Sequence, residues 1–341
     1  MKKIVVFGNP LLDTTVFLQD NFLLDKYNLK EDDQKEITSD EMKRLSEDIS
    51  GYQQHRSAGG CGQNSLRVLQ WLTGKRCDAV IFGSVGKDKE ADILRGLLKN
   101  DGVQTRYIEQ DLPTGKTVAL VKSPFRSLVA YIGAAEHLPL NDLLREKDFP
   151  GLVLNSDFVY IEGYFLTNRE ETAKHVLDYC NKHNKIVIFN ICGKYVCDVC
   201  PETVRYFVEN SDVIFGNLGE YEAVGKLVGI DTVDELTGRL IGNGRNKMKR
   251  YGNIIVITNG DNPGSCIYEG GKKESFPVPK LEKNAVKDTT GAGDAFTGGF
   301  IAGLCEGKSV MDCAKIGCYA ALHIVQQIGC TLPNFSPNIL D

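Results

Sequence analysis

The sequence predicts a three-layer α/β/α fold with a mostly parallel central sheet and a small α/β lid. Short β-branched runs that end in glycine or asparagine alternate with longer segments of helical periodicity. Such alternation is typical of parallel sheets, in which crossover helices cover both faces. Residues 14–60 and 114–135 do not fit the alternation. We expect these two stretches to form the lid over the strand ends.

Six apolar runs predict the strands of the central sheet: KIVVFGN, DAVIFGSVG, DFVYIEGYF, KIVIFNIC, SDVIFGN and NIIVITNG. Each run ends in small or polar residues. Ligands of parallel α/β sheets bind beyond the carboxyl ends of the strands. The residues expected near the chemistry are therefore Asn9, Gly163, Asn190, Asn217 and Asn259.

Segments with apolar residues three or four positions apart predict the helices that connect these strands. In the segment 292–306, the apolar positions form one continuous buried face. The predicted helices are residues 62–74, 88–100, 168–184, 218–228, 292–306 and 309–328.

The lid is predicted from two separated insertions. Residues 14–60 are polar and charge-rich with weak periodicity, and TGKTVALVKSPFRSLVAYIGAA predicts a β-hairpin around SPFRS. The predicted lid therefore comprises residues 14–60 and 114–136, and the large domain comprises residues 1–13, 61–113 and 137–341. The sequence has no internal repeat and no proline-rich linker, so a freely moving second domain is not expected.

Composition and charge exclude several classes of function. The chain has 341 residues and a formal net charge of −5, with no long run of like charge. This composition favours neither a nucleic-acid surface nor a membrane-surface helix. The first apolar run ends too early for a signal peptide, and no stretch approaches the roughly 20 apolar residues of a membrane span. We expect a monomer in the cytoplasm, with the nucleus as a further compartment.

The eleven cysteines are scattered through apolar segments, which is typical of reduced thiols in a cytosolic protein. Their one cluster is Cys192, Cys197 and Cys200. A single CxxC without a second pair of ligands is a weak zinc signal, so packed thiols are the favoured interpretation. The five histidines show no metal-ligand spacing.

The stretch KDTTGAGDAFTGGF, residues 287–300, has a glycine-rich turn that enters a helix. It is not a Walker A loop, because no lysine follows Gly293, and it is not GxGxxG, because Phe296 occupies the third glycine position. The backbone N–H groups of Gly291, Ala292 and Gly293 would form an anion site sized for one developing oxyanion.

Asp294 follows this turn and has two open interpretations. It could act as a base that takes a proton from a hydroxyl group while that oxygen attacks phosphorus. It could also be an acid in the first turn of a helix, a common feature that contributes about 0.3–1 kcal/mol. Spacing alone leaves both interpretations open.

The segment from Asp288 to Phe300 resembles the signature of the ribokinase-like (PfkB) family of sugar and nucleoside kinases. Within the family, the chain resembles the adenosine kinases over almost its whole length. The segments FGNPLLD, AGGCGQNS, PTG, GYFLT, DVIFGN with NxxE, and GCTLP occur in the family's order and spacing. The resemblance implies a ribokinase-like fold and transfer of the γ-phosphoryl group of ATP to the 5′-hydroxyl of adenosine, giving AMP and ADP in purine salvage.

The resemblance also implies roles for individual residues. Asp294 would be the base, and Gly291, Ala292 and Gly293 the anion hole. Asp13 would accept hydrogen bonds from the ribose 2′- and 3′-hydroxyls, because a carboxylate suits a vicinal diol. The rest of the ribose site would be Asn9, Gly59, Gly60 and Asn64.

On the ATP side, Arg126 of the hairpin would reach the transferring phosphate, for which its permanent charge and forked geometry are suited. Asn217 and Glu220 of the NxxE element would hold Mg²⁺, largely through water. The alternative for Glu220 is a plain first-turn helix acid. The remaining ATP contacts would come from Thr258, Gly260 and Thr290.

The adenine site implied by the resemblance is an apolar and aromatic slot with one polar group. It would contain Leu11, Gln34, Leu128, Ala130, Phe165 and Tyr195. The chain departs from the vertebrate pattern at Glu36, Tyr131 and Thr290, and at Lys89–Ala91. These departures should affect base selectivity and affinity rather than phosphoryl transfer.

Three other functions are weighed against this one. The first is another ribokinase-like nucleoside or sugar kinase, and the second is a catalytically idle nucleoside-binding protein on the same scaffold. The third is a nicotinamide dehydrogenase, which is disfavoured because the first strand runs into GNPLLD instead of GxGxxG.

Overall fold

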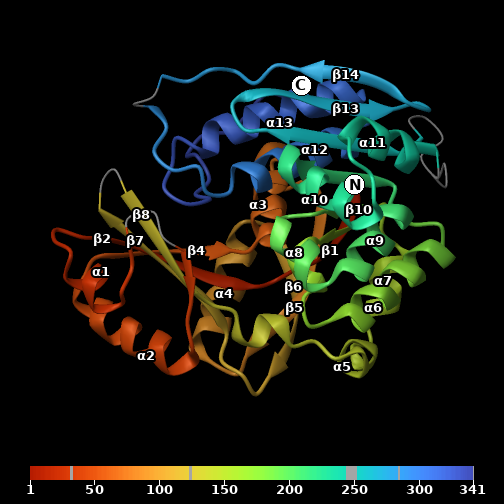
Figure 1. The fold of residues 1–341 in the computed structure, drawn as a ribbon. Coiled ribbons are helices and arrows are strands. Elements are labelled where there is room, and N and C mark those ends of the chain that lie inside the picture. Colours follow the sequence, from red (N-terminus) through yellow and green to blue (C-terminus); the bar gives the residue numbers. More distant parts are fainter. Residues whose placement is uncertain (31–33, 123–124, 243–251, 283–284, 341) are drawn as a thin grey trace.

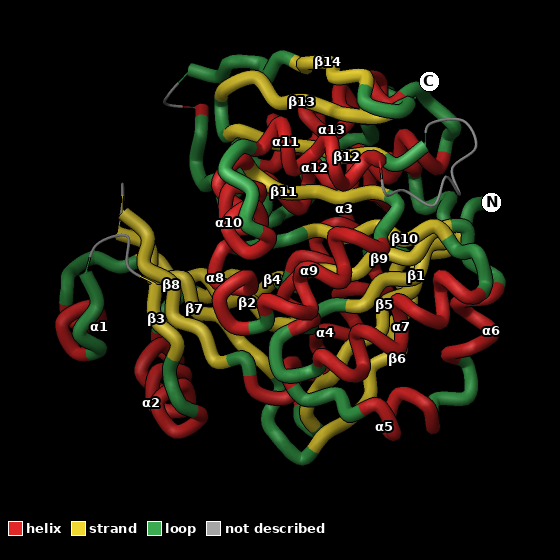
Figure 2. Tube along the Cα trace, turned by 45° about the vertical axis from the view of Figure 1, so that its right-hand side comes forward, coloured by secondary structure: helices red, strands yellow, loops and turns green. Residues whose placement is uncertain are grey.

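The computed structural model describes residues 1–30, 34–122, 125–242, 252–282 and 285–340, which form two sheets with their helices (Figures 1 and 2). The larger sheet has nine strands in the order β14-β13-β12-β11-β10-β9-β1-β5-β6. Seven neighbouring strands, from β12 to β6, run parallel, and β13 and β14 add an antiparallel edge. The predicted mostly parallel sheet is confirmed.

The strands of the larger sheet have these bounds: β1 (Lys3–Phe7), β5 (Asp78–Gly86), β6 (Val103–Gln110), β9 (Phe158–Glu162), β10 (Ile186–Asn190), β11 (Val213–Asn217), β12 (Ile254–Asn259), β13 (Asn262–Tyr268) and β14 (Lys272–Phe276).

Helices cover both faces of this sheet, which gives the predicted three layers. Within β1, Ile4 and Val6 pack into one hydrophobic cluster, and Val5 and Phe7 pack into another on the opposite face. The first face carries α3 (Cys61–Thr73), α4 (Lys89–Asn100), α12 (Ala292–Cys305) and α13 (Val310–Ile324). The second carries α5 (Leu140–Arg145), α6 (Phe149–Leu154), α7 (Glu170–Lys182), α8 (Lys194–Val199), α9 (Pro201–Asn210), α10 (Leu218–Val228) and α11 (Val233–Gly242).

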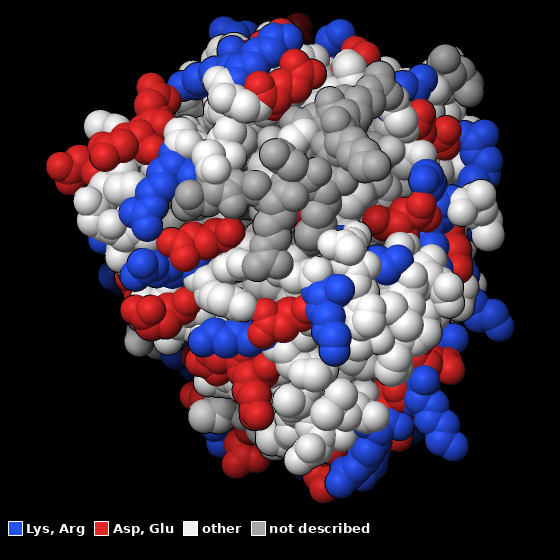
Figure 3. All heavy atoms as spheres, turned by 90° about the vertical axis from the view of Figure 1, so that its right-hand side faces the viewer, with Lys and Arg blue, Asp and Glu red and all other residues white. Residues whose placement is uncertain are grey.

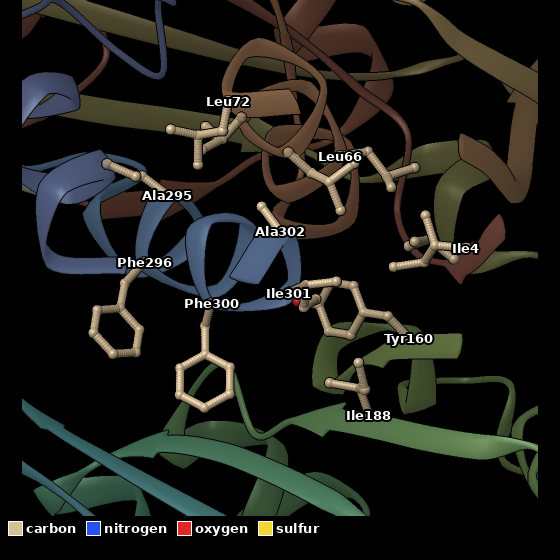
Figure 4. Packing of buried hydrophobic residues seen from close by; sticks show 14 of the residues in the cluster. Ile4, Leu66, Leu72, Tyr160, Ile188, Ala295, Phe296, Phe300, Ile301 and Ala302 are labelled. Atoms are coloured by element: carbon tan, nitrogen blue, oxygen red, sulfur yellow. The ribbon is translucent and has the colours of Figure 1, made fainter. Parts of the chain in front are cut away.

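Helix α12 is deeply packed, and its residues from Ala295 to Cys305 are all buried. Phe296 and Phe300 lie on its sheet side, while Leu66 and Leu72 of α3 lie on its other side (Figure 4). A β-carbon on Gly298 would collide with the carbonyl oxygen of Ser65, so a glycine is required where α12 crosses α3. This close approach fixes the start of α12 against the start of α3.

The smaller sheet has five strands in the order β3-β8-β7-β2-β4. One of its faces packs on two short helices through a separate hydrophobic cluster that includes Val16, Leu45 and Val129. In Figure 2 this unit lies to one side of the large sheet. Its elements are β2 (Leu11–Phe17), α1 (Phe22–Lys26), β3 (Gln34–Glu36), α2 (Ser39–Asp48), η1 (Ile49–Gly51), β4 (Gln54–Gly59), β7 (Gly115–Lys122) and β8 (Phe125–Tyr131).

Strands β7 and β8 are the antiparallel arms of the predicted hairpin, whose tip residues 123–124 lie outside the described residues. The predicted boundary of the lid at residue 14 differs from the structure. Strand β2 already begins at Leu11, where it pairs with Gly59 and Gly115. Leu11 and Asp13 therefore belong to the smaller sheet.

The chain crosses between the two sheets four times. It enters the smaller sheet through residues 8–10 and 111–114, and it returns at Gly60 and through residues 132–133. The crossings lie side by side in two pairs, since a β-carbon on Gly60 would collide with the carbonyl oxygen of Asn9 and the Ala134 N–H donates to the Pro113 carbonyl at 2.9 Å.

On the face of the molecule shown in Figure 3, the basic and acidic side chains are interspersed rather than segregated. Within the described ranges, no helix combines the length and the apolar character needed to cross a membrane.

Three short helices follow strand ends within three residues: η2 (Gly133–Glu136) after β8, η3 (Gly163–Leu166) after β9, and α8 after β10.

Candidate active site

Asp294 is the third residue of α12, whose N-cap is Gly291 with a left-handed φ of 76°. The side-chain amide of Asn64 on α3 donates to Asp294 Oδ2 at 2.9 Å, and the Ser65 hydroxyl donates to the Asp294 carbonyl at 3.0 Å. Burial raises the pKa of the Asp294 carboxyl above its ordinary value, and the Asn64 amide opposes this rise. The carboxylate is therefore fixed in orientation and is a stronger base than an exposed aspartate.

The predicted anion site lies in the turn before Asp294. The Ala292 N–H donates to the Thr289 carbonyl at 3.2 Å, so one of the three predicted donors already has a partner. The Ala295 N–H closes the first helical bond, to the Gly291 carbonyl at 2.8 Å. In a helix, the N–H groups before that bond have no intrahelical acceptor. The N–H groups of Gly293 and Asp294, which follow Ala292 in the first turn of α12, are thus available to an anion.

A cavity of about 190 Å³ adjoins this turn and brings together residues from α3, β10, β11, α10, β12 and α12. Gly293 and Asp294 of α12 line it together with Asn217, Glu220 and Thr258. Its volume is smaller than the roughly 300–1,000 Å³ of a site that encloses a whole drug-sized ligand. The cavity is sized for a transferring phosphoryl group with water rather than for a nucleoside.

Asn217 and Glu220 form the cap of α10. The Asn217 N–H and side-chain amide each donate to a different oxygen of Glu220 at 2.8 Å, and the Glu220 N–H donates to Asn217 Oδ1 at 3.0 Å. Burial raises the pKa of Glu220, while Asn217 and the charge of Lys194 oppose the rise. The two interpretations of Glu220 are compatible, because one carboxylate both caps the helix and faces the cavity.

The same donor set fits Mg²⁺ held through water. Both Glu220 oxygens already accept one hydrogen bond each, and a carboxylate oxygen can accept a second one from a metal-bound water. Mg²⁺ retains several of its waters in such sites. Within the described ranges, no group of three Asp, Glu, His or Cys side chains could hold a metal directly, and this includes the three cysteines of ICGKYVCDVC.

Asp13 lies on β2, next to Thr117 of β7. The Thr117 hydroxyl donates to Asp13 Oδ1 at 2.5 Å. Burial raises the pKa of Asp13 to about 6, opposed by the hydrogen bond from Thr117 and the charge of Arg126. A β-carbon on Gly59 of the neighbouring strand would collide with this carboxylate, so glycine keeps the approach to Asp13 clear.

The other predicted ribose residues surround the crossing from β4 to α3. Gly60 is the N-cap of α3 with a left-handed φ of 88°. The Asn9 N–H donates to Glu162 Oε1 at 2.8 Å, and Arg169 donates to Asn9 Oδ1 at 2.7 Å. Glu162 and Arg169 were missed by sequence reasoning.

Arg126 of β8 connects the smaller sheet to the glycine-rich turn. Its Nη1 donates to the Thr290 hydroxyl, and its Nε lies 3.6 Å from Asp288 Oδ2. Burial alone would raise the pKa of Asp288, but the N–H groups of Thr290 and Gly329 and the charge of Arg126 lower it below its ordinary value. The lid arginine therefore lies within reach of the predicted phosphate site.

The predicted adenine residues of the smaller sheet lie together. Gln34 of β3 pairs with Leu128 of β8, and Glu36 pairs with Ala130. Leu11 of β2 is half-buried on the same sheet. Burial raises the pKa of Glu36, and the nearby charge of Glu136 adds to the rise.

The structure corrects the placement of Phe165. Its side chain is 0% exposed and packs in the core, 5.7 Å from the Phe7 ring, with the Arg169 guanidinium 4.6 Å from its own ring centroid. Tyr195 is 46% exposed and stacks on Tyr164 at 5.7 Å. Tyr164 and Tyr195, rather than Phe165 and Tyr195, form the accessible aromatic pair.

The remaining predicted residues are less closely grouped. Thr258 lines the cavity beside Asp294, but Gly260 follows the end of β12 and is not part of the lining. Tyr131 is adjacent in sequence to Ala130, so the two side chains lie on opposite faces of the sheet. Tyr131 lines a groove of about 730 Å³ beside α2 instead of the base site.

The chain is similar to proteins of a known family. The family model described as pfkB family carbohydrate kinase matches residues 33–337. Adenosine kinase 2 of Arabidopsis thaliana is 33% identical over 328 residues, covering 96% of this chain and 94% of the relative.

Two solved structures are similar in fold and sequence. Anopheles gambiae adenosine kinase in complex with P1,P4-di(adenosine-5) tetraphosphate has a TM-score of 0.83 and 33% identity, covering 97% of this chain and 98% of that one. Schistosoma mansoni adenosine kinase in complex with adenosine and AMP has a TM-score of 0.82 and 27% identity, covering 97% of both chains.

Proposed function

Because the chain belongs to the pfkB carbohydrate kinase family, we propose that it transfers the γ-phosphoryl group of ATP to the 5′-hydroxyl of adenosine, giving AMP and ADP. The relatives that match nearly its whole length are adenosine kinases, and related structures hold adenosine and AMP, or P1,P4-di(adenosine-5) tetraphosphate. The structural observation that carries the proposal is the position of Asp294. Its carboxylate lies in the first turn of α12, held by Asn64, at a cavity of phosphoryl size.

Neighbouring groups of the site take the proton of the acceptor hydroxyl and stabilise the charge on the transferring phosphoryl group. Asp13 accepts hydrogen bonds from the ribose 2′- and 3′-hydroxyls, which directs the 5′-hydroxyl toward Asp294. Asp294 takes the proton of this hydroxyl as the oxygen attacks the γ-phosphorus. The first-turn N–H groups of α12 and the Arg126 guanidinium stabilise the negative charge on the transferring group.

The ATP side of the site is formed by residues near the ends of β11 and β12, Asn217, Thr258 and Gly260, together with Thr290 of the glycine-rich turn. Asn217 and Glu220 would hold Mg²⁺ through its water ligands, and the ion supplies charge neutralisation on the phosphates when it is bound. We propose a monomer as the working unit.

A nucleoside panel tests the proposed function. Turnover of adenosine, inosine, guanosine, ribose and fructose is measured with Mg-ATP in an assay coupled to ADP release. Adenosine should give the highest kcat/KM, as the proposed function requires. The aromatic pair Tyr164 and Tyr195 should favour all three purine nucleosides over the two sugars.

Two results would contradict the proposal. Faster turnover of a sugar or another nucleoside would favour the alternative kinase. Adenosine binding by calorimetry without ADP release on addition of Mg-ATP would favour an idle nucleoside-binding protein.

A further inference from the structure

We propose that Glu162 is a positioning residue of the transfer site. It holds the loop after β1, which carries Asn9, and the start of α3 in fixed positions relative to Asp294. The proposal rests on the proposed function for the identity of the acceptor. It assigns a role to a buried carboxylate for which the transfer chemistry described above has no use.

Glu162 is the last residue of β9 and is 0% exposed. Its Oε1 accepts the Asn9 N–H at 2.8 Å, and its Oε2 accepts the Gly62 N–H at 2.5 Å. Asn9 follows β1, and Gly62 is the second residue of α3. One side chain therefore joins two backbone segments that carry predicted ribose residues.

The surroundings of Glu162 are built for this carboxylate. A β-carbon on Gly8 would lie 2.6 Å from Oε2, and one on Gly62 would lie 3.0 Å from it. Glycine at both positions brings the backbone close enough to donate. The positive end of the 13-residue helix α3 also favours a negative charge at this point.

Arg169 balances the buried charge on the far side of Asn9. It is 3% exposed and donates to Asn9 Oδ1 at 2.7 Å, to the Tyr164 carbonyl at 2.8 Å and to the Ala135 carbonyl. Burial lowers the pKa of Arg169 to about 10, so the guanidinium stays charged at neutral pH. Asn9 is thus held through its backbone by an anion and through its side chain by a cation.

The connection to catalysis runs along α3. Asn64, which donates to Asp294, lies two residues after Gly62 on the same helical turn. Loss of the Gly62 bond would release the first turn of α3 and with it the amide that orients the base. Glu162 therefore acts on transfer through Asn64, without touching the reacting atoms.

The ionisation of Glu162 also depends on charged groups of the site. Burial raises the pKa of Glu162 to about 7, and the N–H groups of Asn9 and Gly62 oppose the rise. The charge of Asp294 adds to the rise, and the charge of Arg169 opposes it. Other titratable groups that sense Glu162 are Tyr160 on β9, Cys61 on α3 and Cys192 after β10. Protonation of Glu162 would turn one of its oxygens into a donor that faces a backbone N–H. The two hydrogen bonds from Asn9 and Gly62 therefore require the ionised carboxylate.

The test is Glu162→Gln in the full chain. The amide has a single acceptor oxygen, so one of the two N–H groups is left facing a donor. We expect kcat for the acceptor to fall and its KM to rise, each by about 10-fold or more, with the KM for ATP unchanged. An ionisation near pH 7 in the kcat/KM profile of the wild type should disappear. Glu171→Gln, an exposed acid on α7, is the matched control and should leave all four readouts unchanged.

A purely structural role would lower the melting temperature of Glu162→Gln and leave the KM values and the pH profile as in the wild type, which would overturn the proposal. If Glu162→Gln fails to fold, Glu162→Asp decides. It keeps the charge and shortens the reach by one methylene, so it should keep the ionisation and raise the acceptor KM, and a wild-type KM would contradict the proposal. All rates use the best acceptor of the nucleoside panel, so an error about adenosine remains distinguishable from an error about Glu162.

Discussion

The large domain and the lid hold their parts of the site in different ways. On the large domain, the carboxylates of Asp294 and Glu220 are each fixed by hydrogen bonds from within that domain, at 2.8–2.9 Å. On the lid, Gln34 is exposed and Leu128 and Ala130 are only half-buried. We therefore propose that the groups for phosphoryl transfer are preorganised, and that the groups expected to contact the base would become enclosed when the lid closes on substrate.

The largest effect is expected from Asp294→Asn, which removes the proposed base but keeps the size and shape of its side chain. We expect kcat to fall by about 10²–10⁴-fold while calorimetry shows adenosine binding close to that of the wild type. Asp312→Asn is the matched control, because Asp312 occupies the equivalent third position of α13, where its N–H bonds to the Ser309 cap. If Asp294→Asn retains most of the wild-type kcat, Asp294 is only a first-turn helix acid.

Arg126→Ala tests the lid residue that already reaches the large domain. We expect kcat to fall by about 10²-fold, because one cationic donor to the transferring phosphoryl group is lost. Arg126→Lys should recover part of the rate, since it restores charge without the fork. Arg205→Ala on α9 removes an exposed arginine of a surface ion pair and should leave kcat unchanged. An equal kcat for Arg126→Ala and the wild type would show that the lid contributes no charge to transfer.

Asp13→Asn should raise the KM for adenosine by about 10-fold, because one acceptor for the ribose diol is lost. In the wild type, the adenosine KM should rise as the pH falls through about 6, the pKa of Asp13. The folded-state pKa is raised above the ordinary 3.8, so the native state binds this proton more tightly than the unfolded state. Stability therefore falls as the pH rises from about 4 to 6.

Because burial destabilises the ionised carboxylate more than Thr117 and Arg126 stabilise it, we expect that Asp13→Asn does not lower the melting temperature at pH 8. A lower melting temperature together with an unchanged KM would make Asp13 a structural residue of the lid sheet.

The smallest effect on activity is expected at the aromatic residues that border the two regions. Tyr195→Ala should raise the adenosine KM several-fold with little change in stability, because its ring is accessible. Phe165→Ala should instead destabilise the fold by about 3–5 kcal/mol, as is typical of a buried aromatic residue. Denaturant unfolding and the adenosine KM of both variants separate these outcomes. A raised adenosine KM with little loss of stability for Phe165→Ala would instead support the predicted place of Phe165 in the adenine site.

The parts of the fold and site that could be predicted are those specified by local sequence. The glycine-rich turn, α12 and Asp294 lie within 20 residues of one another, and the strand ends that carry Asn9, Asn190 and Asn217 follow continuous apolar runs. The start of β2 could not be predicted, because Leu11 joins the lid sheet through pairing with residues 59 and 115.

Other features depend on distant partners. Glu162 meets Asn9 across 153 positions of sequence, so no spacing rule could connect them. Tyr164 and Phe165 are adjacent, and the short helix η3 decides which ring enters the core. The short helices α5 and α8 have six residues each, too few for a clear helical period.

The four crossings between the sheets have a consequence for covalent connectivity. Each entry into the lid contains a proline, Pro10 or Pro113, and each return contains a glycine with positive φ, Gly60 or Gly133. Cleavage of any one crossing would leave three covalent ties, so a nicked chain would keep its lid. Because the crossings are gathered in two adjacent pairs, we propose that any movement of the lid would turn about the line through the two pairs.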